Sequence, residues 1–190
     1  MTQEAIEVEV KIPVRSWEDV IGRLEQAGFE QNGVHEETDT YYNSAWYNLR
    51  EHDKALRIRR VKNLTEQRSW AELNCKGPKL DQVSVSRRET EMILEDPDRM
   101  AQILEELEFY PTEVAVRKIR FYFRRGRITA SVDRVEGLGD FLELEIMENG
   151  EDKRRECLNE IKMVMQEIGY EMVNTVRTSY LSLLQKKSEN

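Results

Sequence analysis

Charged and aliphatic side chains alternate near the start of this chain. Glu7, Glu9 and Lys11 occupy every second position, with Val8 and Val10 between them. Because successive side chains of a β-strand point to opposite faces, a strand here carries its charges on one face and its aliphatic groups on the other. Carboxylates bind cations and ammonium groups bind anions, so the charged face could bind ions if it lies inside the protein.

The same alternation returns along the chain and predicts further strands. Arg57 and Arg59, for example, alternate with aliphatic residues. The expected strands are 7–12, Thr38–Tyr42, Leu56–Arg59, Glu72–Lys76, Val85–Ile93, Val116–Phe123, Ile128–Arg134 and Phe141–Ile146. Their mostly short connections favour antiparallel neighbours. If the charged faces meet one another, these eight strands form a barrel with a charged interior.

Ion pairs on a solvated sheet surface are the alternative explanation for the charged rows. Such pairs are common on exposed faces and contribute little stability. This explanation must account for every charged row while each opposite face stays apolar, and agreement across many segments is stronger evidence than any single row. We therefore favour the charged interior.

Length and charge limit the functional classes. The chain has 190 residues and a net charge of -8, so we expect a single domain spanning residues 1–190 and no general nucleic-acid surface, which would need a basic face. The sequence contains neither a signal peptide nor an apolar stretch of membrane-spanning length. Cys75 and Cys157 lack metal-ligand spacing and are expected to be reduced core thiols. These features predict a cytoplasmic protein without a membrane partner.

Four amphipathic segments are predicted to form helices that pack around the barrel. Ser16 is an expected N-cap, and Pro97 is an expected first helical residue. The apolar residues of the segments recur at helical spacing, which suits them to cover the apolar outer faces of the strands. The predicted helices are Ser16–Ala27, Pro97–Leu107, Asp152–Ile168 and Thr178–Gln185.

Seven ordered elements resemble the CYTH superfamily, also called the triphosphate tunnel metalloenzymes. They are Glu7-x-Glu9-x-Lys11, Leu56-Arg57-Ile58-Arg59, Lys76-Gly77-Pro78, Arg87-x-Glu89-x-Glu91, Lys118-x-Arg120, Asp133, and Gly137-Leu138-Gly139-x-Phe141-x-Glu143-x-Glu145. The last element resembles in particular the branch named for class IV adenylate cyclases. One E-x-E-x-K motif alone is weak evidence, whereas seven elements in order, with consistent strand parity, are a specific signal.

The resemblance implies an α+β fold in which an eight-stranded antiparallel β-barrel, with helices packed around it, holds a triphosphate. The implied metal ligands are Glu7, Glu9, Asp133, Glu143 and Glu145. The implied substrate-binding residues are Arg57, Arg59, Lys76, Arg87, Lys118 and Arg120, and the implied catalytic residues are Lys11, Arg57, Lys76 and Lys118. Ligands that offer only oxygen favour Mg²⁺ or Mn²⁺.

Two features of the implied site are open to more than one interpretation. Glu89 and Glu91 could contact the metal or could orient neighbouring arginines. Trp46 could stack on a base at the mouth of the barrel, or it could cover the barrel end or contact a second subunit. With seven basic and seven acidic side chains on the inward faces, the empty barrel is expected to be formally balanced in charge.

The reaction depends on what attacks the triphosphate. Attack of the ribose 3′-hydroxyl on the α-phosphorus of ATP gives cyclic AMP and pyrophosphate, whereas attack of water on the γ-phosphorus gives orthophosphate. We predict the adenylate cyclase reaction because Gly137-Leu138-Gly139 resembles that branch. The alternatives are a triphosphatase acting on tripolyphosphate, nucleoside triphosphates or thiamine triphosphate, and a non-catalytic polyphosphate or nucleotide binder. The branch also implies a homodimer.

Overall fold

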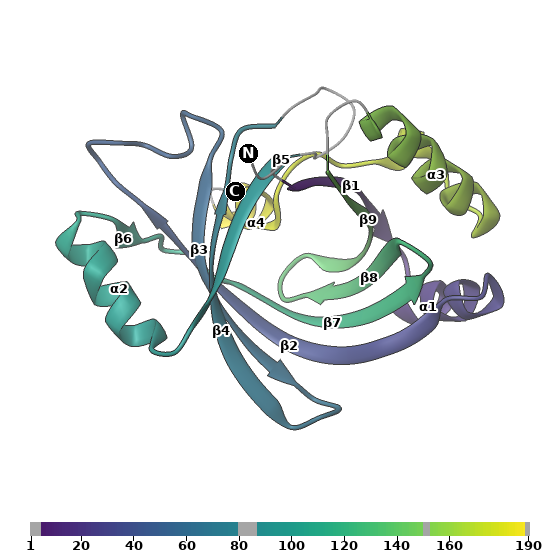
Figure 1. The fold of residues 1–190 in the computed structure, drawn as a ribbon, viewed down its shortest axis with the longest axis horizontal. Helices are drawn as coiled ribbons and strands as arrows, with labels where there is room; N and C mark the ends of the chain where they lie inside the picture. Colours follow the sequence, from purple (N-terminus) through teal and green to yellow (C-terminus); the bar gives the residue numbers. More distant parts are fainter. Residues whose placement is uncertain (1–4, 80–86, 150–152, 189–190) are drawn as a thin grey trace.

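Eight long strands form a closed antiparallel barrel in the computed structural model, which describes residues 5–79, 87–149 and 153–188 (Figure 1). The strands are β1 (Ala5–Val14), β2 (Glu30–Asn43), β3 (Ala55–Asn63), β4 (Arg68–Lys76), β5 (Arg87–Leu94), β7 (Val116–Arg125), β8 (Ile128–Val135) and β9 (Gly139–Asn149). They follow the order β3-β4-β5-β1-β9-β8-β7-β2, and β2 pairs with β3 to close the sheet. The predicted eight-stranded antiparallel barrel is confirmed.

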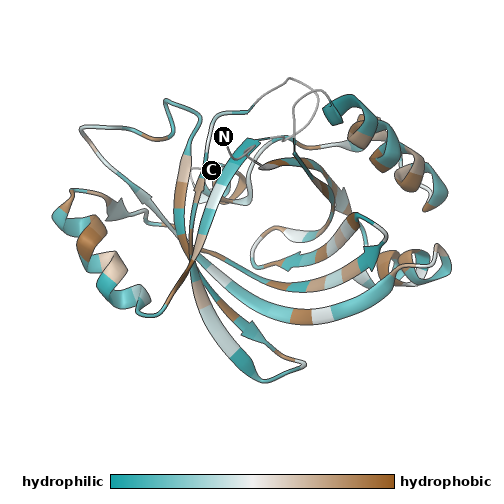
Figure 2. Ribbon diagram, viewed as in Figure 1, coloured by the Kyte–Doolittle hydropathy of each residue, from teal (hydrophilic) through white to brown (hydrophobic). Residues whose placement is uncertain are grey.

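Strand register brings the charged faces together inside the barrel. Glu9 lies opposite Glu145 across β1 and β9, and Arg59 lies opposite Asp39 across β3 and β2. Because side chains alternate along each strand, these pairs fix which face of every neighbouring strand points inward. Figure 2 shows the resulting alternation of hydrophilic and hydrophobic residues along the strands.

The helices begin and end close to the predicted residues. They are α1 (Trp17–Gln26), α2 (Pro97–Glu106), α3 (Arg154–Glu167) and α4 (Tyr180–Ser188), with a short 3-10 turn at Met172–Asn174. The hydroxyl of Ser16 accepts a hydrogen bond from the backbone N–H of Asp19 at 3.3 Å, as expected of an N-cap. Pro97 is in the first turn of α2, where its missing N–H costs nothing. Asp152, the predicted start of the third helix, lies outside the described residues.

The main apolar core lies outside the barrel, between the outer faces of the strands and helices α1 and α3. Val8, Val10 and Leu144 point outward from β1 and β9 and are at most 3% exposed. They pack in one cluster with Leu24 of α1 and Ile161 of α3. A second cluster places α2 against the outer faces of β3 and β4, on the opposite side of the barrel in Figure 1. Helices therefore shield the aliphatic faces and leave the charged faces to line the interior.

Three details differ from the sequence predictions. The short strand predicted at Thr38–Tyr42 is the longest strand, β2, which has 14 residues. Its sequence contains no aliphatic row, so its length depends on pairing with β3 and β7 on both sides. Helix α4 does not pack only on the outside, because Tyr180 is buried at one end of the barrel. Cys75 is exposed, whereas Cys157 is buried as predicted.

Two further observations complete the fold. A short strand, β6 (Tyr110–Pro111), extends the sheet at the end of β2. The predicted strand Val85–Ile93 corresponds to β5, which begins at Arg87, and its first two residues lie outside the described residues. None of the described helices is long and apolar enough to cross a membrane.

Candidate functional site in the barrel interior

The inward faces of the strands line a cavity of about 830 Å³. Thirteen of the fourteen charged residues expected inside the barrel line this cavity: Lys11, Arg57, Arg59, Lys76, Arg87, Lys118, Arg120, Glu7, Glu9, Glu89, Glu91, Glu143 and Glu145. Glu9, Lys11 and Arg59 are each at most 7% exposed, so they are not part of a solvated surface. The interpretation as exposed ion pairs is therefore wrong for these rows.

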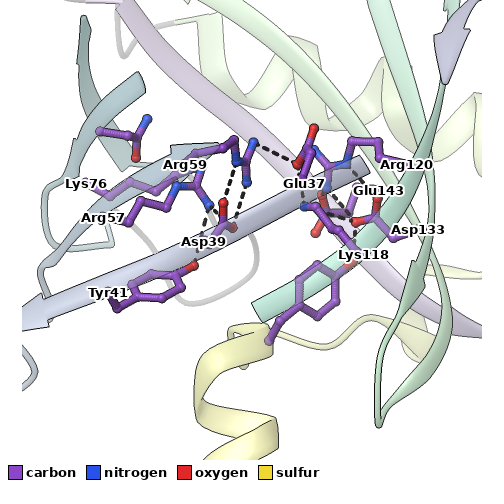
Figure 3. A network of polar contacts seen from close by, with 12 residues as sticks. Glu37, Asp39, Tyr41, Arg57, Arg59, Lys76, Lys118, Arg120, Asp133 and Glu143 are labelled. Carbon is purple, nitrogen blue, oxygen red and sulfur yellow. Dashed lines mark hydrogen bonds and ion pairs between the residues drawn. The ribbon is translucent and has the colours of Figure 1, made fainter. Parts of the chain in front are cut away.

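One group of interior acids is fully compensated by arginine and lysine, and we call it the paired cluster. It contains Glu37, Asp39 and Asp133 together with Arg57, Arg59, Lys118 and Arg120 (Figure 3). The Nε and Nη2 of Arg59 donate to the two oxygens of Asp39 at 2.6 and 2.9 Å, and Arg57 Nη1 donates to Asp39 Oδ2 at 3.1 Å. The two-pronged contact fixes the guanidinium group of Arg59, and the single hydrogen bond holds that of Arg57 beside it.

Arg120 makes a similar pair with Asp133. Its Nε and Nη2 donate to the two Asp133 oxygens at 2.6 and 2.5 Å, and Nη2 also contacts Glu143. Lys118 Nζ lies 3.3 Å from Glu37 and 3.5 Å from Asp133. Burial alone would raise the pKa of Glu37, but Arg59 and Lys118 lower it to about 2. Burial would likewise raise the pKa of Asp39, but the positive charges of Arg57 and Arg59 lower it.

The structure places Asp133 differently from the other predicted metal ligands. It has no exposed surface and is not part of the cavity lining. Both of its oxygens are engaged by Arg120, and Tyr180 also donates to Oδ2 at 2.9 Å. A carboxylate held in this way orients Arg120 rather than offering a free oxygen to an ion.

The second group of interior acids, Glu7, Glu9 and Glu145 on β1 and β9, has fewer cationic partners, and we call it the acidic seam. Burial, together with the charges of Glu9 and Glu143, raises the pKa of Glu145 to about 7 despite the opposing effect of Arg120. Burial also raises the pKa of Glu7, although Lys76 Nζ lies 2.7 Å from its carboxylate. Glu143, adjacent to the seam, behaves oppositely, because Arg120 and Lys11 overcome its burial and lower its pKa.

The chemistry of these side chains suits a hard divalent cation. Glu7, Glu9, Glu143 and Glu145 offer only carboxylate oxygens, the ligands that Mg²⁺ and Mn²⁺ prefer. Two glutamates directly opposite each other on neighbouring strands repel, and a bound cation would remove that repulsion. Among the described residues, no three acidic, His or Cys side chains already converge closely enough to hold an ion. The chemistry of the four carboxylates fits the metal, and their oxygens would move closer together to bind it.

The comparison with protein families identifies the fold. The sequence model of the CYTH domain matches residues 5–180. The chain belongs to the CYTH family. A Methanocaldococcus jannaschii protein named as a candidate adenylate cyclase is 35% identical over 178 residues, which cover 94% of this chain and 98% of that protein.

Solved structures share the CYTH barrel. A Pyrococcus horikoshii structure superposes with a TM-score of 0.87 at 30% identity and covers 95% of this chain and 99% of its own. A Hippeastrum protein, described as a candidate adenylyl cyclase with a dominant triphosphatase activity, superposes with a TM-score of 0.65 at 18% identity. It covers 96% of both chains, and at this identity the likeness concerns the fold alone.

Sequence reasoning missed several residues of the CYTH barrel interior. Glu37 and Asp39 are each 1% exposed, and Tyr122 donates to Glu37 Oε1 at 2.8 Å. The alternation of Glu37, Asp39 and Tyr41 along β2 carried the signal that would have identified the two acids. Nothing comparable pointed to Tyr180, which comes from a helix rather than from a strand.

The predicted balance of seven basic and seven acidic groups also needs correction. In the described part of the CYTH barrel, twelve Lys and Arg residues and eight Asp and Glu residues line the cavity. The additional cations come from loops and from the region of α4: Arg50, Lys54, Lys79, Arg177 and Lys186. Strand periodicity could not reveal them. Glu37, Asp39 and Asp133 lie buried behind this lining, so the described interior holds twelve basic and eleven (eight plus three) acidic groups and is close to charge balance.

Two further sequence hypotheses can be compared with the CYTH structure. The side-chain amide of Asn74 donates to both Glu89 and Glu91, and Lys76 lies 2.9 Å from Glu89. These contacts favour the interpretation that Glu89 orients a basic neighbour, Lys76, whereas the contact of Glu91 is with an uncharged amide. Trp46 is 62% exposed, packs beside Phe109 and is not part of the cavity lining, so its stacking on a base at the mouth of the barrel stays a prediction.

Proposed function

We propose that this protein is a metal-dependent enzyme that acts on the triphosphate of a nucleotide, with conversion of ATP to cyclic AMP and pyrophosphate as its reaction. The observation that carries the proposal is one cavity inside the closed barrel, in which fixed arginines and lysines face an acidic seam. Cations alone would suit an anion-binding module. Carboxylates able to hold a divalent metal favour an enzyme.

The basic residues would bind the triphosphate. Guanidinium groups can each engage two phosphate oxygens, and ammonium groups act as point charges. The proposed binding residues are Arg57, Arg59, Lys76, Arg87, Lys118 and Arg120. Because Asp39 already holds Arg57 and Arg59, these two guanidinium groups need little reorganisation when charge develops on the phosphates. Lys11, Arg57, Lys76 and Lys118 are the proposed catalytic cations.

Glu7, Glu9, Glu143 and Glu145 would hold Mg²⁺ or Mn²⁺, which would supply positive charge to the phosphate oxygens when bound. Asp133 is left out of this set because, unlike Glu143, it does not line the cavity and has no exposed surface, and Arg120 and Tyr180 occupy its oxygens. Its proposed role is to orient Arg120.

A nucleotide is favoured over tripolyphosphate by the neutral part of the cavity. Leu49, Leu56 and Leu181 line the cavity together with the charged residues, and its volume of about 830 Å³ is at the large end of small-molecule sites. Such surfaces suit a base and a ribose. The relative from M. jannaschii, named as a candidate adenylate cyclase, supports the same choice.

Hydrolysis of a triphosphate is the second candidate function. The charged lining that would recognise the triphosphate does not specify whether a ribose hydroxyl or water attacks. The description of the Hippeastrum protein, which shares the fold, motivates this alternative. A binder without catalysis is the third candidate, and the homodimer remains a prediction that sedimentation can test.

One experiment separates these functions. Purified protein is incubated with ATP and Mn²⁺ or Mg²⁺, and the products are resolved by chromatography, with Glu145→Gln as the control for contaminating activity. Cyclic AMP with pyrophosphate is the expected result. ADP with orthophosphate, or cleavage of tripolyphosphate with ATP untouched, would overturn the cyclase in favour of a triphosphatase. Binding without turnover of ATP, tripolyphosphate or thiamine triphosphate would leave only the binding module.

A further inference from the structure

Tyr180 is the first residue of α4 and lies inside the barrel rather than outside it. It is 6% exposed, and its ring meets Phe141 edge-on with the centroids 5.0 Å apart. Its hydroxyl donates to Asp133 Oδ2 at 2.9 Å. The side chain therefore combines a fixed ring with a fixed hydrogen bond at one end of the charged cavity.

Two of the proposed cations lie over this ring. Lys11 Nζ is 4.4 Å from the ring centroid of Tyr180, and Lys118 Nζ is 5.4 Å from it. Both lysines are at most 5% exposed. The negative face of an aromatic ring attracts an ammonium group within about 6 Å, and the attraction is stronger where water is excluded.

The two lysines differ in their nearest acidic partners, and Lys118 Nζ also lies 3.5 Å from Asp133. Lys11 Nζ lies 3.3 Å from Glu143 on β9, whereas Lys118 Nζ lies 3.3 Å from Glu37 on β2. A lysine has a flexible four-carbon stem, so its ammonium group takes the position that its neighbours impose. The ring of Tyr180 is the uncharged surface that both ammonium groups share.

The backbone preceding α4 is attached at the same place. The N–H of Val176 donates to the carbonyl oxygen of Lys11 at 2.8 Å. The connection to the helix is thus tied to the strand residue whose side chain lies over Tyr180. This hydrogen bond limits how far the ring can move relative to β1.

We propose that Tyr180 is a positioning residue, whose ring holds the ammonium groups of Lys11 and Lys118 toward a bound triphosphate while its hydroxyl fixes Asp133 behind them. The inference rests on the proposed function, because it treats both lysines as triphosphate-binding cations. It assigns a role in the site to the C-terminal helix, which the sequence motifs do not include.

A purely structural role for Tyr180 is the alternative, since its ring also belongs to a small apolar cluster with Val116 and Val135. Three variants separate the roles. Tyr180→Phe keeps the ring and removes the hydroxyl, whereas Tyr180→Leu removes the ring. Leu184→Ala loosens the packing of α4 at a residue that lies outside the cavity lining.

The first measurement is the affinity for tripolyphosphate by calorimetry without metal. Loss of two buried cation–π contacts in Tyr180→Leu should weaken binding about tenfold. Tyr180→Phe should weaken it less than about threefold, since the ring remains. Leu184→Ala should lower the melting temperature while the affinity stays within about twofold of the parent. If Tyr180→Leu fails to fold, Tyr180→Met provides a ring-free side chain of more similar volume.

The decisive measurement repeats Tyr180→Leu in a Lys11→Met, Lys118→Met background. If the ring acts through the lysines, the substitution should change affinity less than about twofold there, because the groups it positions are gone. A weakening of the same size in both backgrounds, or no weakening in the parent, would overturn the inference. Binding with these effects but no turnover of any triphosphate would overturn only the proposed enzyme and would support the positioning role. Absence of tripolyphosphate binding by the parent would overturn both.

Discussion

The paired cluster and the acidic seam lie in the same barrel interior, but their carboxylates have different partners. Asp39 receives hydrogen bonds from Arg57 and Arg59, and its pKa is lowered. Glu145 lies directly opposite another glutamate, and its pKa is raised to about 7. Asp39 is the more deeply buried of the two, yet its pKa is lowered, because a buried charge is stable where its counter-charge is near.

The comparison suggests that the paired cluster and the acidic seam have different roles. The paired cluster contains its own counter-charges and should contribute to the stability and rigidity of the barrel. The acidic seam has unbalanced negative charge that a metal ion would compensate. Four predictions test this division, beginning with the largest expected effect.

The paired cluster should be the more sensitive region for stability. Asp39→Asn should lower the free energy of unfolding by about 3–5 kcal/mol, because it leaves the buried Arg57 and Arg59 without their shared counter-charge. Urea denaturation measures the loss. Asp98→Asn is the matched control, since Asp98 forms an exposed pair with Arg60 and should contribute at most about 1 kcal/mol. Equal losses at the two aspartates would contradict the proposed role of the cluster.

Substitutions in the acidic seam should lower catalytic activity rather than stability. Glu9→Gln or Glu145→Gln should lower triphosphate turnover at least about 100-fold if the ion is bound there. Their melting temperatures should stay unchanged or rise, because each change relieves repulsion between opposed glutamates. Glu148→Gln, near the end of the same β9 and outside the cavity lining, should leave turnover unchanged. Turnover near that of the parent in both seam variants, at saturating Mg²⁺ or Mn²⁺, would rule out this metal site.

Binding of tripolyphosphate should stabilise the fold, because basic side chains line the cavity. Tripolyphosphate at about 100 times its dissociation constant should stabilise the fold by about 2.7 kcal/mol and raise the melting temperature. Orthophosphate should do much less, since it spans fewer cations. Arg57→Ala should reduce the shift while Asp39 keeps its two-pronged pair with Arg59. Equal shifts for both anions would argue against a site shaped for a chain of phosphates.

Acid should destabilise the paired cluster over a defined range of pH. The folded-state pKa of Glu37 is about 2, below its ordinary value of 4.5, so its contribution is present above pH 4.5 and is lost as the pH falls toward 2. Between pH 5 and pH 3 this loss should amount to about 2 kcal/mol. Glu37→Gln should flatten the pH dependence of unfolding in this range. An unchanged slope in the variant would show that Glu37 does not carry the effect.

The sequence determined which residues of each strand share a face and where most helices begin and end. Both depend on residues that are close in the sequence. The alternation at Glu7, Glu9 and Lys11, repeated in the later strands, predicted a charged inward face, and Ser16 was sufficient to predict where α1 begins. The same local pattern placed Arg57 and Arg59 on one face. A period of two residues is a property of the strand itself and needs no knowledge of its neighbours.

The tertiary structure decided which charges meet. Lys76 and Glu7 are 69 residues apart in the sequence and 2.7 Å apart in the barrel. Asp133 has the inward parity of a metal ligand, yet the register of β7 and β8 gives its oxygens to Arg120. Tyr180 enters the site from a helix, where strand periodicity carries no information. Partner choice depends on strand register and helix docking across the closed barrel, which local sequence patterns do not encode.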